Sequence, residues 1–139
     1  MKFLHLNFLP RSADVGLLVI RLWYGGSLLA LHGWGKLMNF SSMSGQFMDP
    51  FGIGKTPSLA LSTFAELFCA ALVVLGAFTR IAALIAAINM ATAFWFAHHA
   101  TLVGQGNGEL PFMYLGAFVA LFLAGGGKFS VDATIGAKS

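Results

Sequence analysis

Four long apolar stretches recur along the chain, separated by short polar segments. They cover about residues 15–37, 57–78, 81–98 and 110–124, and each is close to the roughly 20 residues that a helix needs to cross a bilayer. The runs are continuous and lack the alternation that a membrane β-barrel strand requires. Pro57 and Pro111 fall where the second and fourth stretches begin, a position that suits proline in a helix. The pattern predicts an all-α, four-helix transmembrane bundle.

The composition fits lipid better than water. Of the 139 residues, 58% are hydrophobic and only 9% are charged, whereas soluble domains average roughly 25% charged residues. A soluble protein of this composition would expose adhesive surface on every side. The net charge of +3 comes without any basic cluster, so nucleic acid is not an expected partner. We expect one domain spanning residues 1–139, with the lipid bilayer as its surroundings.

The basic residues predict how the chain sits in the membrane. The side expected to be outer has only Lys36, near the end of the first stretch, and Lys55. The opposite side carries five basic residues: Lys2, Arg11, Arg80, Lys128 and Lys138. Because cytoplasmic segments are enriched in Lys and Arg, this bias predicts a multi-pass protein with both termini in the cytoplasm.

Polar residues form one face of the first predicted helix. Arg21 and His32 are eleven residues apart, and at about 100° per residue they point within about 20° of each other, with Gly25 and Lys36 close to the same direction. A charge at the bilayer centre costs at least about 2.5 to 3.5 kcal/mol. We therefore expect this face to turn toward the bundle interior. The alternative is that Arg21 and Lys36 extend to the headgroups at opposite ends.

A carboxylate lies in the middle of the second predicted helix. Glu66 requires a cation at that depth if it is ionised, and Arg21 is the expected partner. Asn89, at similar depth in the third stretch, is expected to hydrogen-bond one member of the pair. A purely structural Arg21–Glu66 pair that orients the helices is the alternative.

Aromatic and histidine side chains gather at the outer ends of the helices. Trp34 and Trp95 could wall a pocket for a flat apolar ring such as a quinone, or they could belong to an interfacial aromatic belt. His32, His98 and Glu109 could bind a metal or relay protons. Their spacing is not diagnostic, and interfacial histidines are the simpler interpretation, so no metal site is expected from this pattern.

Several short segments together resemble the DoxX family of small bacterial membrane proteins. The resemblance runs in order over nearly the whole chain. It is carried by RLWYG at 21–25, HGWGKL at 32–37, Glu66, LGAFTR at 75–80, NGEL at 107–110 and GGGKFSVD at 125–132. Two departures stand out: Gly126 replaces a proline usual in the final turn, and Phe68 and Cys69 stand where the family often has glycines near the carboxylate.

The resemblance implies a four-helix bundle in the bacterial inner membrane. The family that the chain resembles is named for subunits linked to sulfur-compound oxidation coupled to quinone. Some relatives are associated with redox and oxidative-stress enzymes. We therefore expect a redox-linked subunit, belonging to a quinone-linked oxidoreductase, that binds a quinone or another small apolar molecule in an intramembrane polar pocket. Glu66 and His32 are the candidate catalytic residues, and the candidate binding residues are Arg21, His32, Lys36, Glu66, Asn89, Trp34, Trp95 and His98.

Two other functions stay open at this point. The chain could be a non-catalytic scaffold or partner subunit, or it could transport a small solute or protons as a homo-oligomer. The sequence has no haem, flavin or iron–sulfur motif, so a redox role requires a redox partner protein or a diffusible electron donor.

Overall fold

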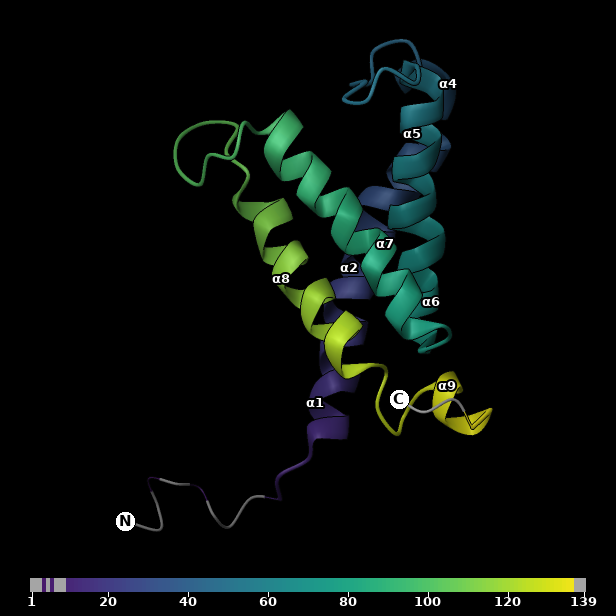
Figure 1. Cartoon of the computed structure of the whole chain (residues 1–139), viewed down its shortest axis with the longest axis vertical. Helices are drawn as coiled ribbons and strands as arrows, with labels where there is room; N and C mark the ends of the chain where they lie inside the picture. The colour runs from purple at the N-terminus through teal and green to yellow at the C-terminus, as the bar shows by residue number, and fades with distance from the viewer. Residues whose placement is uncertain (1–3, 5, 7–9, 137–139) are drawn as a thin grey trace.

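Three helices long enough to cross a membrane, together with a shorter apolar helix, form the body of the molecule (Figure 1). The computed structural model describes Leu4, Leu6 and residues 10–136, so Lys2 and Lys138, two of the residues that predict orientation, lie outside the described residues. In the described part all regular structure is helical. Three continuous apolar helices run over Ala13–Met38, Lys55–Leu75 and Thr79–Ala97, with 26, 21 and 19 residues. The fourth apolar helix, α8 (Glu109–Ala124), has 16 residues and is shorter than a typical span.

The three long helices alternate between α-helical and π-helical segments. The helix Ala13–Met38 consists of α1 (Ala13–Ile20), η1 (Arg21–Gly25), α2 (Gly26–Leu28), η2 (Leu29–Gly33) and α3 (Trp34–Met38). The helix Lys55–Leu75 consists of α5 (Lys55–Thr63), η3 (Phe64–Cys69) and α6 (Ala70–Leu75), and the third of α7 (Thr79–Thr92) and η4 (Ala93–Ala97). Two single turns, α4 (Phe40–Met43) and α9 (Val131–Thr134), complete the structure. Arg21, His32 and Glu66 all lie in π-helical segments, which are frequent at functional sites.

The predicted helices are close to those observed, with one clear difference at the end of the second. It was expected to reach residue 78 but ends at Leu75, because Gly76 takes a left-handed conformation with φ of +71°. A Cβ at Gly76 would lie 2.6 Å from Nη2 of Arg21. The chain therefore turns here in a way that only glycine permits without displacing that side chain.

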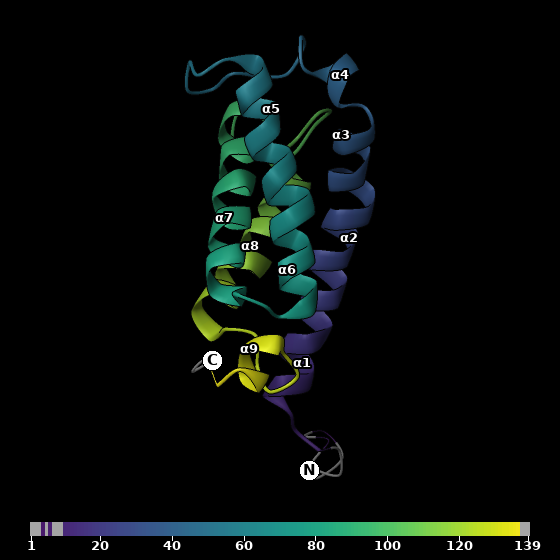
Figure 2. The same ribbon diagram turned by 90° about the vertical axis from the view of Figure 1, so that its right-hand side faces the viewer.

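The core forms mainly where α7 and α8 lie side by side (Figure 2). On α7, Ala82, Ala83 and Ala86 are at most 1% exposed. On α8, Phe118 and Leu121 are fully buried. Small residues on one helix let the backbone of its neighbour approach closely, which is how helices associate where lipid removes the hydrophobic driving force.

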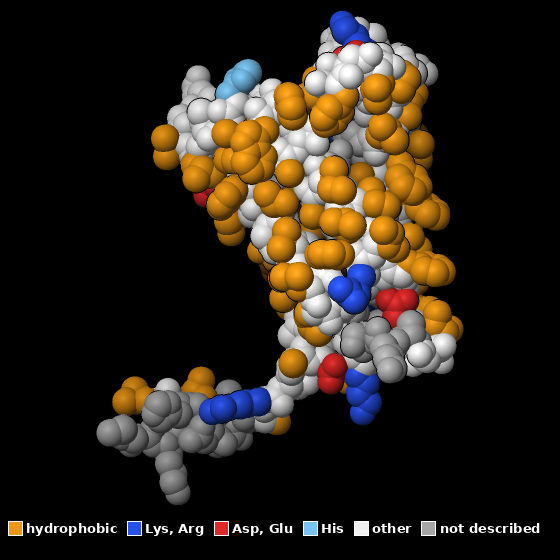
Figure 3. All heavy atoms as spheres, viewed as in Figure 1, with side chains coloured by type: hydrophobic (Ala, Val, Ile, Leu, Met, Phe, Trp, Pro, Cys, Tyr) orange, Lys and Arg blue, Asp and Glu red, His pale blue; other side chains and the backbone are white. Residues whose placement is uncertain are grey.

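The outer surface is apolar over the middle of the helices. Figure 3 shows hydrophobic side chains over most of the visible helical face, with Lys, Arg, Asp and Glu toward its two ends. Trp23, Leu31 and Leu123 are 72%, 73% and 69% exposed. Such a continuous apolar surface is stable in contact with acyl chains and not with water. The chain is therefore a membrane protein.

Asp132 fixes the tight turn between α6 and α7. Its carboxylate accepts hydrogen bonds from the backbone N–H groups of Phe78 (2.7 Å) and Thr79 (2.9 Å), which begin α7. Its own N–H donates to the carbonyl of Gly76 at 2.9 Å. Partial burial by itself would raise the pKa of Asp132, but the amides of Thr79 and Phe78 and the positive charge of Arg21 outweigh it and hold the pKa below its ordinary value.

We predict that Asp132→Ala lowers the free energy of unfolding by about 0.5 to 2 kcal/mol, the usual cost of losing a helix N-cap. Because the pKa is depressed in the folded protein, the stabilisation is complete above the ordinary pKa of an aspartate and is lost as pH falls through the lower folded value. Thermal unfolding in detergent should therefore show wild type and variant converging at acid pH. Asp132→Asn, which keeps an acceptor, should lose less. A difference that stays constant from neutral to strongly acid pH would contradict this account.

Candidate functional site

Glu66 is the centre of a buried polar cluster. It lies on η3 and is 5% exposed. Lys36, from α3, forms an ion pair with Oε2 of Glu66. Asn89 Nδ2, from α7, donates to Oε1 at 3.0 Å, and Ser62 Oγ donates to the same oxygen at 3.3 Å. The predicted hydrogen bond between Asn89 and the carboxylate therefore forms, and three helices meet at one side chain.

The predicted pairing of Arg21 with Glu66 is wrong. Arg21 is 1% exposed, and within the described residues its guanidinium donates to four backbone carbonyl oxygens. Two belong to Val73 and Val74, both at 2.9 Å, and two to Gly126 and Phe129, at 2.9 and 2.8 Å. The last carbonyls of a helix lack intrahelical partners, and Arg21 supplies the donors for them.

This placement also sets Arg21 apart from the other candidate binding residues. The side chain is buried among carbonyl groups and lines neither of the two cavities between the helices. At 1% exposure the Arg21 side chain makes its contacts within the protein. Its role in the structure is to join η1 to the end of α6 and to the segment after α8.

Close backbone contact between the first two helices brings Lys36 to Glu66. A Cβ on Gly33 would lie 2.3 Å from the carbonyl oxygen of Glu66. Further along the same interface, a Cβ on Gly25 would lie 3.1 Å from Cγ1 of Val73. Gly25 and Arg21, which lie on the predicted polar face of the first helix, are both buried, so that face turns inward as predicted.

The first cavity, which we call the polar cavity, opens beside the Lys36–Glu66 pair and has a volume of about 150 Å³. His32 contacts Tyr114 edge to face, with ring centroids 5.9 Å apart, and the Tyr114 hydroxyl lies 2.8 Å from Oγ of Ser27. The polar residues that line the polar cavity are His32, Lys36, Glu66, His98 and Tyr114. The apolar residues that line it are Leu28, Met90, Ala93, Leu110 and Pro111.

The polar cavity gathers four of the predicted site residues and one that was missed. His32, Lys36, Glu66 and His98 come together as expected. Nδ1 of His98 lies 2.8 Å from the carbonyl oxygen of Gly106, which fixes the ring against the loop before α8. Tyr114 was not predicted. The available signal was a tyrosine inside an otherwise apolar span, since a buried hydroxyl needs a partner.

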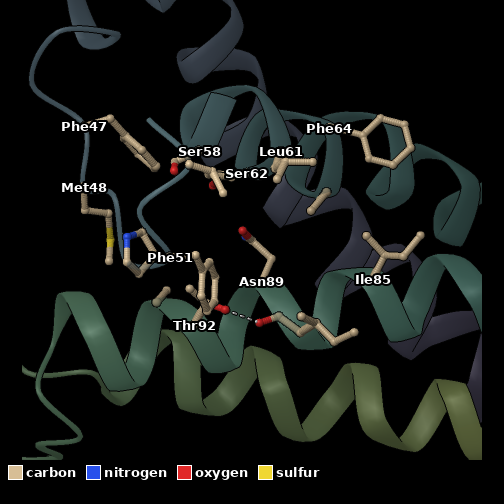
Figure 4. A pocket seen from close by; sticks show the side chains of 15 residues that line it. Phe47, Met48, Phe51, Ser58, Leu61, Ser62, Phe64, Ile85, Asn89 and Thr92 are labelled. Atoms are coloured by element: carbon tan, nitrogen blue, oxygen red, sulfur yellow. Dashed lines mark hydrogen bonds between the residues drawn. The ribbon is translucent and has the colours of Figure 1, made fainter. Parts of the chain in front are cut away.

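The second cavity, which we call the lateral cavity, has a volume of about 390 Å³ (Figure 4). It lies between the helices Lys55–Leu75 and Thr79–Ala97, with residues 47–53 over one end. The sequence pattern did not predict it. Ser62 and Asn89 line this cavity while both hydrogen-bond to Glu66. The Glu66 cluster therefore separates the two cavities.

Asp49 holds the segment that covers one end of the lateral cavity. Its carboxylate accepts from the backbone N–H groups of Ile53 (3.0 Å) and Gly54 (2.9 Å) and from Oγ of Ser58 (3.1 Å). Desolvation would raise the pKa of Asp49, but these hydrogen bonds, that of Gly54 first, outweigh it and lower the pKa. The carboxylate is therefore ionised, and the turn is held, at every pH above the ordinary range of an aspartate.

The remaining predicted residues lie away from both cavities. Trp34 and Trp95 are 56% and 57% exposed and belong to neither lining. Within residues 10–136 together with Leu4 and Leu6, no group of three His, Cys, Asp or Glu side chains is positioned to hold a metal ion. His32, His98 and Glu109 therefore do not assemble into a metal site.

Comparison with known proteins shows which family the chain belongs to. The DoxX family model matches residues 16–99. A protein of Haemophilus influenzae, described as uncharacterized, is 33% identical over 114 residues, which cover 76% of this chain and 80% of the relative. No solved structure matches the chain. The matched region contains Arg21, Lys36, Glu66 and Asn89, and therefore the whole Glu66 cluster.

We predict that Gly33→Ala destabilises the protein by about 1 to 3 kcal/mol, the usual cost of overpacking, because its methyl group would meet the immobile backbone of Glu66. Gly35→Ala is the matched control on the same helix, since a methyl group there would meet nothing within 4 Å. It should leave stability unchanged or raise it slightly, as alanine favours helix over glycine. Thermal unfolding in detergent measures both. Equal midpoints for the two variants would show that the close approach at Gly33 is not present.

Proposed function

Since the chain belongs to the DoxX family, we propose that it is a multi-pass protein of the bacterial inner membrane that binds a quinone or another small apolar molecule in the polar cavity. In this role it serves as a redox-linked subunit of a quinone-linked oxidoreductase. The observation that supports this most is the Lys36–Glu66 pair at the wall of a cavity between apolar helices, with side chains that are only 17% and 6% exposed. A buried charge pair is costly in lipid, and such residues are usually functional.

The chemistry of the polar cavity suits a carbonyl group. An ammonium group has three donor hydrogens, and Lys36 uses one on Glu66, so others are available to a carbonyl oxygen. His32 and His98 add imidazole nitrogens, which can donate or accept a hydrogen bond. Met90, Leu110 and Leu28 supply apolar walls. A quinone site needs hydrogen-bond donors, a proton path and apolar contacts, and residues for each are present.

The size of the polar cavity limits what it can enclose. At about 150 Å³ it is smaller than the roughly 300 to 1,000 Å³ typical of sites that bury a whole drug-sized ligand. We therefore assign it to a ring head group, with any hydrocarbon tail leaving between the helices into lipid. Electrons reach such a head group from a redox partner protein or a diffusible donor, because the sequence carries no haem, flavin or iron–sulfur motif.

The proposed orientation places the start of α1 in the cytoplasm. Figure 2 shows the start of α1, the α6–α7 turn and α9 at the same end of the molecule. Arg80 lies in the first turn of α7 and Lys128 precedes α9, so the described basic residues Arg11, Arg80 and Lys128 belong to this end. The positive-inside tendency supports a cytoplasmic location for it. In this arrangement α8 forms the fourth and shortest crossing.

We predict that Lys36→Met weakens binding of a short-chain quinone, decylubiquinone, at least about tenfold, since its donor to the carbonyl is lost. Binding is measured by calorimetry on the purified protein in detergent, with empty micelles as the blank. Lys55→Met is the control, because Lys55 donates to the carbonyl of Gly45 in an outer loop and lines neither cavity.

A double variant separates loss of folding from loss of binding. Lys36→Met alone leaves a buried carboxylate without its cation, which typically costs about 3 to 5 kcal/mol. Replacing both members, as Lys36→Met with Glu66→Leu, should restore most of the unfolding midpoint because no unpaired charge remains. The proposal requires that quinone binding stays lost in this refolded variant. Wild-type affinity in the double variant, or no binding by the wild-type protein, would refute it.

A further inference from the structure

The lateral cavity has the size of a ligand site and opens beside lipid-facing side chains. Its volume of about 390 Å³ falls in the range of sites that bury a small molecule. Leu61 and Ile88, which line it, are also 60% and 57% exposed on the outer surface. A molecule dissolved in the bilayer can therefore reach this cavity sideways without passing through water.

The hydroxyl groups that line the lateral cavity each donate their hydrogen to another group of the protein. Ser58 Oγ donates to Asp49 Oδ1 at 3.1 Å, and Ser62 Oγ donates to Glu66 Oε1 at 3.3 Å. Thr92 Oγ1 donates to the carbonyl of Ile88 at 2.9 Å. A hydroxyl has one hydrogen to donate and two lone pairs that accept. Toward the cavity these three side chains consequently offer acceptors only.

Asn89 adds a stronger acceptor to the same wall. Its Nδ2 donates to Glu66 Oε1 at 3.0 Å, and an ionised carboxylate can only accept, so the orientation of the amide is fixed by its partner. Figure 4 shows the Asn89 side chain pointing into the cavity with its oxygen at the tip. An amide oxygen in an apolar space gains most from a ligand that donates a hydrogen bond to it.

We propose that the lateral cavity binds a membrane-soluble phenol, with its hydroxyl donating to Oδ1 of Asn89 and its ring held among the aromatic side chains. Phe47, Phe51 and Phe64 supply those rings, and aromatic pairs add stabilisation beyond the area they bury. A carbonyl compound meets acceptor oxygens at Ser58, Ser62 and Thr92, and the one side-chain donor described above that is left for it is the second Nδ2 hydrogen of Asn89. The two cavities therefore differ in their polar groups, since acceptor oxygens predominate in the lateral cavity and the polar cavity offers the ammonium group of Lys36 on the other side of Glu66. This proposal does not require that the polar cavity binds a quinone.

The test compares two probes that differ only in the donor hydrogen, 2-naphthol and 2-methoxynaphthalene. Calorimetry on the full chain in detergent, with empty micelles as the blank, should give about tenfold tighter binding of 2-naphthol, the scale expected when one hydrogen bond to a buried acceptor is lost. Asn89→Leu should abolish the preference. Because that change also removes a hydrogen bond to Glu66, its unfolding midpoint is measured alongside.

A matched pair of variants on α7 locates the site without touching the Glu66 cluster. Ile88→Trp adds bulk at a residue that lines the cavity, and Ile81→Trp adds the same bulk on the same helix at a residue outside the lining, where Ile81 is 53% exposed. We expect Ile88→Trp to weaken 2-naphthol binding at least about tenfold, and Ile81→Trp to leave it unchanged. Decylubiquinone binding should be unaffected by either, so failure here is distinguishable from failure of the proposed function. Equal affinity for the two naphthalenes, or 2-naphthol binding that survives Ile88→Trp, would overturn the proposal.

Discussion

Hydrocarbon offers no hydrogen bonds, and this one constraint explains where the polar residues of this protein lie. A membrane helix that ends must satisfy its last carbonyls from within the protein. Here the guanidinium of Arg21 donates to the end of α6 and to the segment after α8. One side chain thereby joins three parts of the chain, including a contact between residues 21 and 129. The planar fork of arginine suits this task better than the single ammonium of lysine.

The same constraint shapes the candidate site at the other end of the helices. Lys36, Ser62 and Asn89 satisfy Glu66 from three directions. Gly33 makes this arrangement possible because its missing side chain lets the first helix approach the backbone of Glu66. Arg21 fixes how the first two helices lie along each other, and Gly33 fixes how closely they approach. The Lys36–Glu66 pair depends on both.

The sequence predicted the helices, the inward polar face and the Asn89 hydrogen bond, because each follows from local pattern. The predicted Arg21–Glu66 pair was wrong because it was inferred from the direction of side chains around one helix. It did not account for how far apart the two residues lie along the helix axes. The first two helices are antiparallel, so Arg21, near the start of one, lies beside Val73 near the end of the other, about 10 Å beyond Glu66 at 1.5 Å per residue. Lys36, near the opposite end of its helix, lies closer to the carboxylate. Tyr114 and the lateral cavity depend on side-chain shape and on residues 47–53, which no periodicity describes.

Glu66 is shared by groups that face two different cavities, and this has a thermodynamic consequence. Its two oxygens accept from Lys36 on one side and from Asn89 and Ser62 on the other. A molecule that draws Lys36 away alters the charge felt by Asn89, and a molecule held by Asn89 alters the carboxylate that Lys36 neutralises. Thermodynamic linkage is reciprocal. If a molecule in one cavity changes the affinity of the other cavity for its ligand by some factor, that ligand changes the affinity of the first cavity by the same factor. A single carboxylate is thereby enough to make two compartments of a small bundle communicate.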